Sequence, residues 1–437
     1  MFRHALFRHA IALATVALAC LAVGVRANAQ ERDAPKVEIG GQFTSLEVRV
    51  PTDFGLFGST EPGVGGRIGY NVTDFFGVEA ELNLFPQRIS TGGMKQGQFG
   101  VKAGKRWRKF GLFAKARPGF VSFDQVTTPV GTETFTAQNG SVFVYDVYGT
   151  RRRTLFSTDV GGVVEFYPAR NLLVRVDAGD TITRYRAKET RLHNGTIFRD
   201  FPNRVTHNFQ ITTGVAYRFL NPKGADEAEP PAPTRGTPRF EAGIQYTTLV
   251  LNLPTEIGNF FGCGCAGQTS QPALGGRLTF NLNDHVALEG AFDFLRKENF
   301  GSRVTFGKQI TQGQFGVKAG RRFERFGIFG KARPGFLHNT DVLQVVGTRL
   351  ETQFFPGETV VVSVFGFKNK TYFEMDLGGV VEFYPSRRVV TRFDIGDTII
   401  RYRGRVQNSY GLRQSVIIQP DETRHNLQFT AGVGFRF

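Results

Sequence analysis

The sequence is poor in several residue types, and each shortage excludes a class of protein. Among 437 residues there are three cysteines, seven histidines and one tryptophan. Three cysteines cannot build a disulfide-rich framework, and the two that follow residue 29 have no histidine nearby to complete a metal site. After the first thirty residues no stretch approaches the roughly 18 uninterrupted apolar residues of a membrane-spanning helix. If the mature chain enters a membrane, it must do so as strands, and we expect neither a metal nor a cofactor.

The N-terminus predicts export. Residues 1–29 combine a basic start, an apolar run and a small-x-small site at Ala27-Asn28-Ala29, so we expect a signal peptide cleaved near Ala29. Cys20 does not fit a lipoprotein signal, because the leucine before it, Leu18, lies one position away from where such a signal has its leucine. Cys263 and Cys265, in a glycine-rich loop, are then candidates for a small loop disulfide.

The charge is strongly basic. The formal net charge is +16, and the signal segment carries three arginines and no acid, which leaves 16 − 3 = +13 for the mature chain. Because no nucleic-acid motif accompanies this charge, we expect no nucleic-acid partner. We expect instead an outer-membrane lipid surface with phosphate groups, including lipopolysaccharide. The basic clusters fall in expected turns and in one loop: Lys105, Arg106, Arg108 and Lys109; Arg321, Arg322 and Arg325; and Arg151, Arg152 and Arg153.

The chain contains the same unit twice. QGQFGVKAGKRWRKFGLFAKARPGF (residues 96–120) returns as QGQFGVKAGRRFERFGIFGKARPGF (residues 312–336), with 19 of 25 positions identical. Residues 159–186 return in the same way as residues 376–403. The first copy closes on Tyr217-Arg218-Phe219 and the second on Phe435-Arg436-Phe437. Any structure proposed for one copy must therefore suit the other.

Alternation of apolar and polar residues with period two predicts about eight strands per copy. In the first copy they are residues 36–48, 64–73, 75–85, 97–107, 110–123, 157–167, 172–186 and 206–219. Short turns (73–75, 108–109, 168–171) alternate with long loops (50–63, 86–95, 124–156, 187–205), as in an outer-membrane β-barrel. Within the longest loop, Asn139-Gly140 indicates a type I′ hairpin and a β-ribbon above the membrane.

The division of the chain follows from the repeat. We expect a signal peptide over residues 1–29, barrel repeats over 36–219 and 238–437, and a Pro/Ala/acid-rich periplasmic linker over 220–237. Two tandem eight-stranded antiparallel transmembrane barrels fit this division, and so does one barrel of about sixteen strands. The linker is far longer than a periplasmic turn needs, which favours two barrels.

The polar side of the strands predicts charged lumens in which acids and bases nearly balance. Such charges must pair, because a lone buried charge costs several kcal/mol. They form either a structural plug, which the narrow lumen of a small barrel favours, or a narrow ion path. In the first copy the predicted network is Glu38, Arg67, Glu79, Glu81, Lys102, Lys115, Arg117, Asp159, Glu165, Arg175, Asp177 and Arg218; in the second it is Glu241, Arg277, Glu289, Lys318, Lys331, Arg333, Asp376, Glu382, Arg392, Asp394 and Arg436.

One pair of residues departs from this pattern. Asp180 and Asp397 fall on the apolar side of their strands, where either a bulge turns them inward or the strand is already leaving the hydrocarbon. His207 and His425 correspond between the copies, each before an asparagine. No nucleophile–base set or carboxylate pair recurs in both copies, so we expect no catalytic residues.

The strands, the loop alternation and the terminal aromatic-x-Phe together resemble the OmpA-like eight-stranded outer-membrane β-barrel family. The resemblance covers nearly all of the mature chain, twice, and implies a bacterial outer-membrane location. It also implies that Phe435 and Phe437 are read by the barrel-assembly machinery. No peptidoglycan-binding domain follows the barrels, so wall anchoring is not expected. The expected role is structural or surface-binding through the extracellular loops; the alternatives are a passive porin and, more distantly, an outer-membrane enzyme.

Overall fold

The computed structural model describes most of the chain after residue 34. The described residues are 35–437 without 53–54, 87–91, 170, 187, 192–196, 202, 220–237, 253–267, 296–308, 353–358, 410–414 and 420. The expected signal peptide, the linker and the Cys263–Cys265 loop lie outside them. Within the described part of the chain, no helix is long and apolar enough to cross a membrane.

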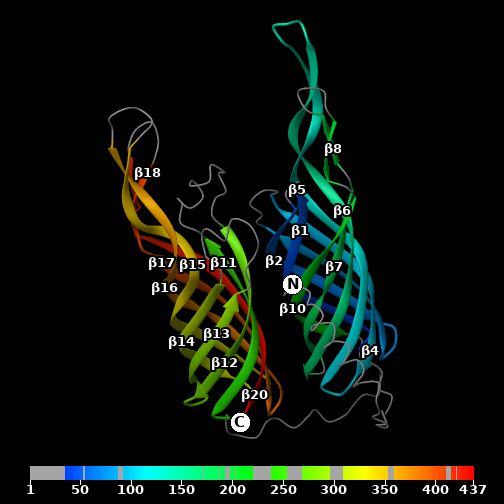
Figure 1. The fold of residues 1–437 in the computed structure, drawn as a ribbon. Coiled ribbons are helices and arrows are strands. Elements are labelled where there is room, and N and C mark those ends of the chain that lie inside the picture. The colour runs from blue at the N-terminus through cyan, green and yellow to red at the C-terminus, as the bar shows by residue number, and fades with distance from the viewer. Residues whose placement is uncertain are drawn as a thin grey trace, which may run out of the picture.

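The first copy folds into a closed antiparallel barrel of eight strands (Figure 1). Around the wall the order is β1-β10-β7-β6-β5-β4-β3-β2. A separate small hairpin, β8–β9, precedes the last strand. The strands are β1 (Val37–Thr52), β2 (Gly55–Asn71), β3 (Phe76–Phe85), β4 (Met94–Arg106), β5 (Phe110–Thr136), β6 (Val142–Ala169), β7 (Leu172–Tyr185), β8 (Lys188–Arg191), β9 (Ile197–Phe201) and β10 (Arg204–Phe219).

The second copy repeats this barrel, in the order β11-β12-β13-β14-β15-β16-β17-β20. The hairpin β18–β19 takes the place of β8–β9. Its strands are β11 (Phe240–Asn252), β12 (Gln268–Asn281), β13 (Val286–Leu295), β14 (Gln309–Arg322), β15 (Phe326–Thr352), β16 (Thr359–Ser386), β17 (Val389–Tyr402), β18 (Arg405–Ser409), β19 (Ser415–Gln419) and β20 (Glu422–Arg436).

Each copy closes on itself. Glu38 of β1 lies opposite Arg218 of β10, and Glu241 of β11 lies opposite Arg436 of β20. The first strand therefore pairs with the last strand of the same copy. This pairing confirms two eight-stranded barrels and contradicts the alternative of one large barrel.

An asparagine continues each closing seam beyond the last paired residues of its ladder. The side-chain oxygen of Asn208 accepts a hydrogen bond from the backbone N–H of Arg49 at 2.9 Å, and that of Asn426 accepts one from Asn252 at 2.7 Å. In both barrels the first and last strands thus remain linked near the outer end, which is the end that carries the long hairpins.

The distribution of polar and apolar residues between the two faces of the wall reverses near that outer end, while the same positions of each strand continue to face inward. Lower on β1, Ile39 faces outward and is 49% exposed, while Glu38 is buried in the lumen. Higher up, Leu46 and Val48 are buried in the lumen, and Glu47 lies on the outward side of the strand. An outward apolar band suits lipid, and an outward polar position suits water, so the reversal marks the upper boundary of the membrane band.

Two hairpins, formed by β5–β6 in the first barrel and by β15–β16 in the second, extend far beyond the walls and are called the ribbons (Figure 1). The strands β5 and β6 stay paired as far as Thr136 and Val142, so most of the predicted 124–156 loop is a ribbon. The predicted type I′ turn is wrong: Gly140 has φ +78°, whereas Asn139 is not among the residues with positive φ. The Gly140 N–H donates to the Ala137 carbonyl at 2.9 Å, which is a type I turn followed by a left-handed glycine.

The predicted long loop over residues 50–63 is also wrong. Strands β1 and β2 pair without interruption to Thr52 and Gly55, so this connection is a tall, tight hairpin. The backbone groups of residues 50–52 and 55–63 form hydrogen bonds between the two strands. Water could equally have satisfied these groups in an open loop above the membrane. Residues 187–205 likewise contain β8 and β9.

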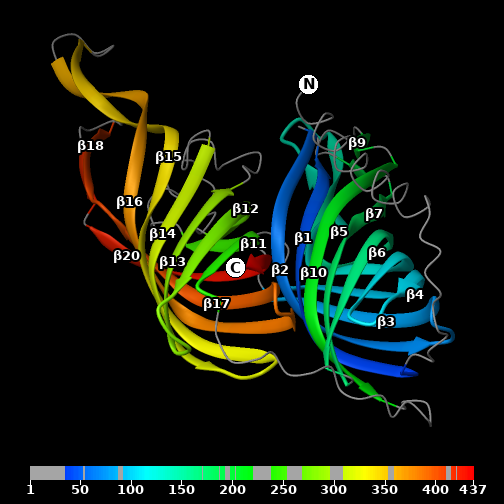
Figure 2. The same cartoon turned by 90° about the horizontal axis from the view of Figure 1, so that it is seen from below.

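The two barrels lie side by side (Figure 2). The ring of Phe43 on β1 stacks on that of Phe429 on β20, with 3.7 Å between the centroids. Nearby, the Ser45 hydroxyl lies 2.9 Å from the Tyr246 hydroxyl of β11. All four residues have outward parity on their strands, so the contact joins the outer walls of the barrels.

Candidate functional site

The lower lumen of the first barrel is filled by a network of ion pairs. Arg175 of β7 binds Glu79 of β3 with both terminal nitrogens, at 2.6 and 2.9 Å, and its Nε lies 2.5 Å from Asp177. Arg117 of β5 binds Asp159 of β6 at 2.5 and 3.0 Å. These guanidinium groups are almost fully buried. A planar fork that meets two carboxylates satisfies most of its donors, which makes burial of the charge tolerable.

Lysines complete the network across the lumen. Lys102 of β4 lies 2.9 Å from Glu38 of β1 and 2.5 Å from Glu165 of β6. Lys115 lies 2.8 Å from Asp159. Lys102 thus joins strands that are not neighbours in the wall and ties the barrel together across its interior, whereas Lys115 joins the neighbouring strands β5 and β6.

The second barrel repeats the arrangement. Arg392 binds Glu289 with two nitrogens and Asp394 through Nε, as Arg175 binds Glu79 and Asp177. Arg333 binds Asp376 at 2.6 and 3.0 Å, and Lys318 binds Glu382. The geometry has therefore been kept through the duplication.

One part of the network differs between the copies. In the first barrel, Glu81 accepts a hydrogen bond from Arg117 at 2.6 Å. Alanine takes the place of Glu81 in the second copy, at position 291. The second barrel instead buries Asp293, bound by Gln245 at 3.0 Å, and Glu374, bound by two glutamines. The second lumen thus carries two carboxylates held by amides, in addition to those that its arginines bind.

An apolar cluster lies above the charges in each lumen. It is formed by inward-facing side chains above the height at which the distribution of polar and apolar residues reverses. In the first barrel it contains Leu46, Val48, Phe85, Met94, Val121, Phe123, Leu155 and Tyr185; in the second, Leu249, Leu251, Ala273, Leu295, Ile310, Leu337, Tyr372, Ile400 and Tyr402. Both ends of the interior are therefore packed with side chains.

All the lumen residues expected from the sequence are buried inside the barrels, Glu81, Arg218 and Arg436 included. The expectation missed Asp293, Glu374 and the apolar clusters. It also placed Arg106 and Arg322 in turns at the lipid surface, which is wrong. Each projects into the lumen, where its Nε lies 2.9 Å from a buried tyrosine hydroxyl. Even-numbered residues of β4 face inward, and continuing this pattern from Lys102 to Arg106 could have identified Arg106 as a lumen residue.

The ribbons carry matching irregularities in both copies. The register shifts between Phe123 and Val126 and again between Pro129 and Gly131. In the second copy the shifts fall between Asn339 and Val342 and between Val345 and Gly347. A bulge bends a strand and redirects its side chains, so the two ribbons share their bends although their sequences differ.

The remaining predicted residues lie on the outer walls. Phe435 and Phe437 are 60% and 74% exposed near the lower end of the second barrel, and Tyr217 and Phe219 take the equivalent places in the first. Among the described residues, no group of three His, Cys, Asp or Glu could hold a metal ion. His207 and His425 each pair with the aspartate that breaks parity, an association that was not expected.

A match to a known family agrees with this fold. Residues 15–219 match the family model described as outer membrane protein beta-barrel domain. None of the curated proteins compared with the chain matches it. Among solved structures, the N-terminal β-barrel domain of Pseudomonas aeruginosa OprF is similar at 12% identity and a TM-score of 0.24, over 43% of this chain and 100% of that one.

Two further solved barrels are similar over one copy. Neisserial surface protein A covers 46% of this chain and 100% of its own, with 10% identity and a TM-score of 0.27. Ail, the attachment invasion locus protein of Yersinia pestis, covers 44% and 100%, with 14% identity and a TM-score of 0.25. The assignment of the fold rests on the strand pairing and on the family match. Residues 15–219 thus match the outer membrane protein beta-barrel family, and the second copy repeats the same closed barrel beside them.

Proposed function

We propose that this outer-membrane protein binds other proteins at the cell surface through its two ribbons and catalyses no reaction. The observation that carries the proposal is the length of the hairpins. The 27 residues of β5 and the 28 of β6 far exceed the 9 to 11 that cross a bilayer. The pairs from Val126–Arg151 up to Thr136–Val142 add a ribbon of roughly 35 Å. A barrel that only spanned the membrane would not need such extensions.

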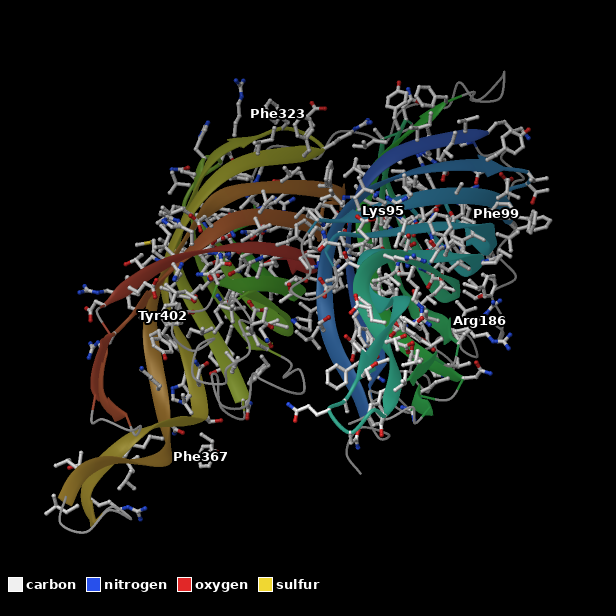
Figure 3. All side chains as sticks on the ribbon, turned by 90° about the horizontal axis from the view of Figure 1, so that it is seen from above. Lys95, Phe99, Arg186, Phe323, Phe367 and Tyr402 are labelled. Carbon is white, nitrogen blue, oxygen red and sulfur yellow. The ribbon has the colours of Figure 1, made fainter. Side chains whose placement is uncertain are left out.

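The surface of the ribbons suits a protein partner. In the first ribbon Phe135, Val142 and Tyr148 are 50%, 62% and 46% exposed, and in the second Leu350 and Phe367 are 72% and 66% exposed. A two-stranded ribbon also leaves one edge of each strand open to pairing with another chain. Apolar side chains beside an open backbone edge favour the addition of a strand from a partner. Figure 3 shows Phe367 on the second ribbon, well outside its barrel.

The packed lumen supports this proposal over a diffusion channel. The charged groups of Arg117, Asp159 and Arg175 are at most 1% exposed, and an apolar cluster covers them. A hydrated ion would have to separate these pairs to pass. We expect the refolded protein to give no conductance steps in planar bilayers. Steps that change with Glu79→Gln or Lys102→Met would contradict a closed lumen and favour the porin.

The binding role is tested by shortening the ribbons. Residues 126–151 and 342–368 are each replaced by Asn-Gly, which keeps the barrel walls. Cells that display either form are then incubated with immobilised fibronectin, collagen and serum albumin, of which fibronectin offers many edge strands. We expect binding by the full chain and its loss in the shortened one, with heat-modifiable migration unchanged. Equal binding by both forms, or none by the full chain, would overturn the proposal.

A further inference from the structure

Each barrel carries the same polar group on its outer wall, which we call the outer-wall patch. In the first barrel the patch consists of Asp180 and Arg184, which have outward parity on β7, Arg186 directly after β7, and His207 on β10. In the second it consists of Asp397, Arg401, Arg403 and His425. The register shows no bulge at Gly179 or at Gly396, so both aspartates face outward.

A hydrogen bond holds the histidine of each patch. Nδ1 of His207 lies 2.6 Å from Oδ2 of Asp180, whose Oδ1 accepts the backbone N–H of Asn208 at 3.0 Å. The equivalent distances in the second barrel are 2.5 and 3.0 Å. With Nδ1 engaged, Nε2 points away from the carboxylate. The side chains of His207 and His425 remain 57% and 71% exposed.

The arginines lie directly above the histidine, at the upper edge of the membrane band. His207 is the register partner of Ile182, so Asp180 and Arg184 are its two diagonal neighbours on the outer wall. On a strand tilted by about 40°, Arg184 lies roughly 30 Å above the start of β7, just beyond an apolar band about 25 Å tall. In the second barrel Arg401 lies opposite the exposed Phe373. Arg186 projects from the outer surface of the first barrel (Figure 3).

The patch has stayed the same while its surroundings changed. On the same outward face, Ala178 corresponds to Ile395, Phe209 to Leu427 and Val205 to Thr423. The four polar residues of the patch are identical in both copies. The aspartate has a structural role, because it binds a backbone N–H. The guanidinium groups of Arg184 and Arg401 are exposed, as is the histidine ring, whose Nε2 donates when the ring is protonated. A polar group beside lipid is costly unless it is used.

We propose that each outer-wall patch binds a phosphate group on the head of an outer-leaflet lipid, the phosphorylated glucosamine of lipid A. Guanidinium and imidazolium groups are the donors that phosphate oxygens prefer. They lie at the height of the lipid heads and face the lipid. The partner is thus a phosphate carried by a lipid, since a free anion would gain nothing from the apolar wall beside the site.

The second patch includes a competing acid. Asp421 lies 2.9 Å from Arg401, and the N–H of Gly404 together with Arg401 holds the pKa of Asp421 below its ordinary value. Asparagine 203 takes this place in the first copy. The first patch is therefore expected to bind phosphate more tightly than the second.

The test uses the refolded full chain in neutral detergent micelles, titrated with lipid A or with dephosphorylated lipid A. Each cation near an anionic group contributes about fivefold in affinity. We expect phosphorylated lipid A to bind at least tenfold more tightly than the dephosphorylated form. The variant R184Q/H207Q/R401Q/H425Q should abolish that preference, and Asp421→Asn should strengthen binding.

Controls separate this site from general attraction between charges. Arg152→Gln removes an arginine that is 67% exposed outside the patch, and it should leave binding unchanged. R184K/R401K keeps the charge and should retain most of the affinity, and heat-modifiable migration verifies the fold of every variant. Wild-type affinity in the quadruple variant, or equal binding of the two lipids, would overturn the proposal. Displacement of lipid A by an equal concentration of inorganic phosphate would overturn the choice of a lipid partner.

Discussion

At the scale of single residues, the lumen contains charges that cannot be removed one at a time without loss of stability. Glu79 accepts two hydrogen bonds from Arg175 inside the first barrel. Replacing Glu79 by glutamine leaves a buried guanidinium without its main partner, which costs about 3–5 kcal/mol. We expect Glu79→Gln to lower the free energy of unfolding by that amount in urea titrations of the refolded protein.

The matched control is Glu133→Gln, which removes a carboxylate from the exposed part of the first ribbon. Its effect should stay within about 0.5 kcal/mol, as is usual for surface positions. Glu289→Gln is the equivalent change in the second barrel, where Arg392 loses the same partner. A loss below about 1 kcal/mol in both barrels would mean that water reaches these charges, and the lumen could not then be called closed.

Residue parity predicted the lower lumen well and the upper lumen poorly. The prediction equated the polar side of each strand with the interior, which holds only where lipid surrounds the barrel. Above the membrane, Leu46 and Val48 form the interior and Glu47 faces out. The reversal is visible in the sequence once its cause is known. The pairing of His207 with Asp180 could not be predicted, since it depends on which strands become neighbours.

At the scale of elements, the bend of each ribbon depends on a glycine opposite a bulge. Val130 is the extra residue of the first ribbon, and a Cβ added at Gly149 would lie 2.8 Å from its Cγ1. Gly366 and Val346 repeat this contact at 2.9 Å. We expect Gly149→Val to displace the bulge and change the direction of the ribbon. Spin labels at Lys95 and Ser141 would report this as a shifted or broadened distance distribution.

Gly131→Ala is the control for this prediction. A Cβ at Gly131 meets nothing within 4 Å, and the residue does not have positive φ. The label distances should therefore match those of the wild type. If Gly149→Val also left them unchanged, the bend would have to come from the bulge backbone alone.

The eight wall strands of each copy could be predicted because their alternation is imposed by lipid on one side and charges on the other. The ribbons were only partly predictable, since both faces meet water and no alternation is required of them. The turn at Asn139-Gly140 shows the same limit: the dipeptide allows a type I′ turn, but the five residues from Ala137 to Ser141 form a longer loop. Local sequence indicated a hairpin there, and pairing along the ribbon determined its form.

At the scale of the whole molecule, the duplication yields two complete barrels rather than halves of one. Each has its own seam, charge network, apolar cluster and ribbon. The sequence favoured this arrangement through the length of the linker, but it contained no signal for the contact between the walls. That contact depends on outward residues, Phe43 and Phe429 among them, that also suit lipid. Side-by-side packing places both ribbons on the same side of the membrane, where one partner could engage both.

The contact between the barrels gives the last prediction. The hydroxyls of Ser45 and Tyr246 lie 2.9 Å apart on facing walls. In a background with Cys263 and Cys265 replaced by serine, Ser45→Cys and Tyr246→Cys should be joined by a short bis-maleimide in refolded protein. After cleavage at a protease site introduced in residues 220–237, the joined halves should migrate together on denaturing gels.

The control combines Ser45→Cys with Phe315→Cys, an exposed position on β14. The two halves of this variant should separate into two bands. Separation of the Ser45–Tyr246 pair would mean that the barrels move independently in the membrane, and the ribbons would then have to bind their partners one at a time.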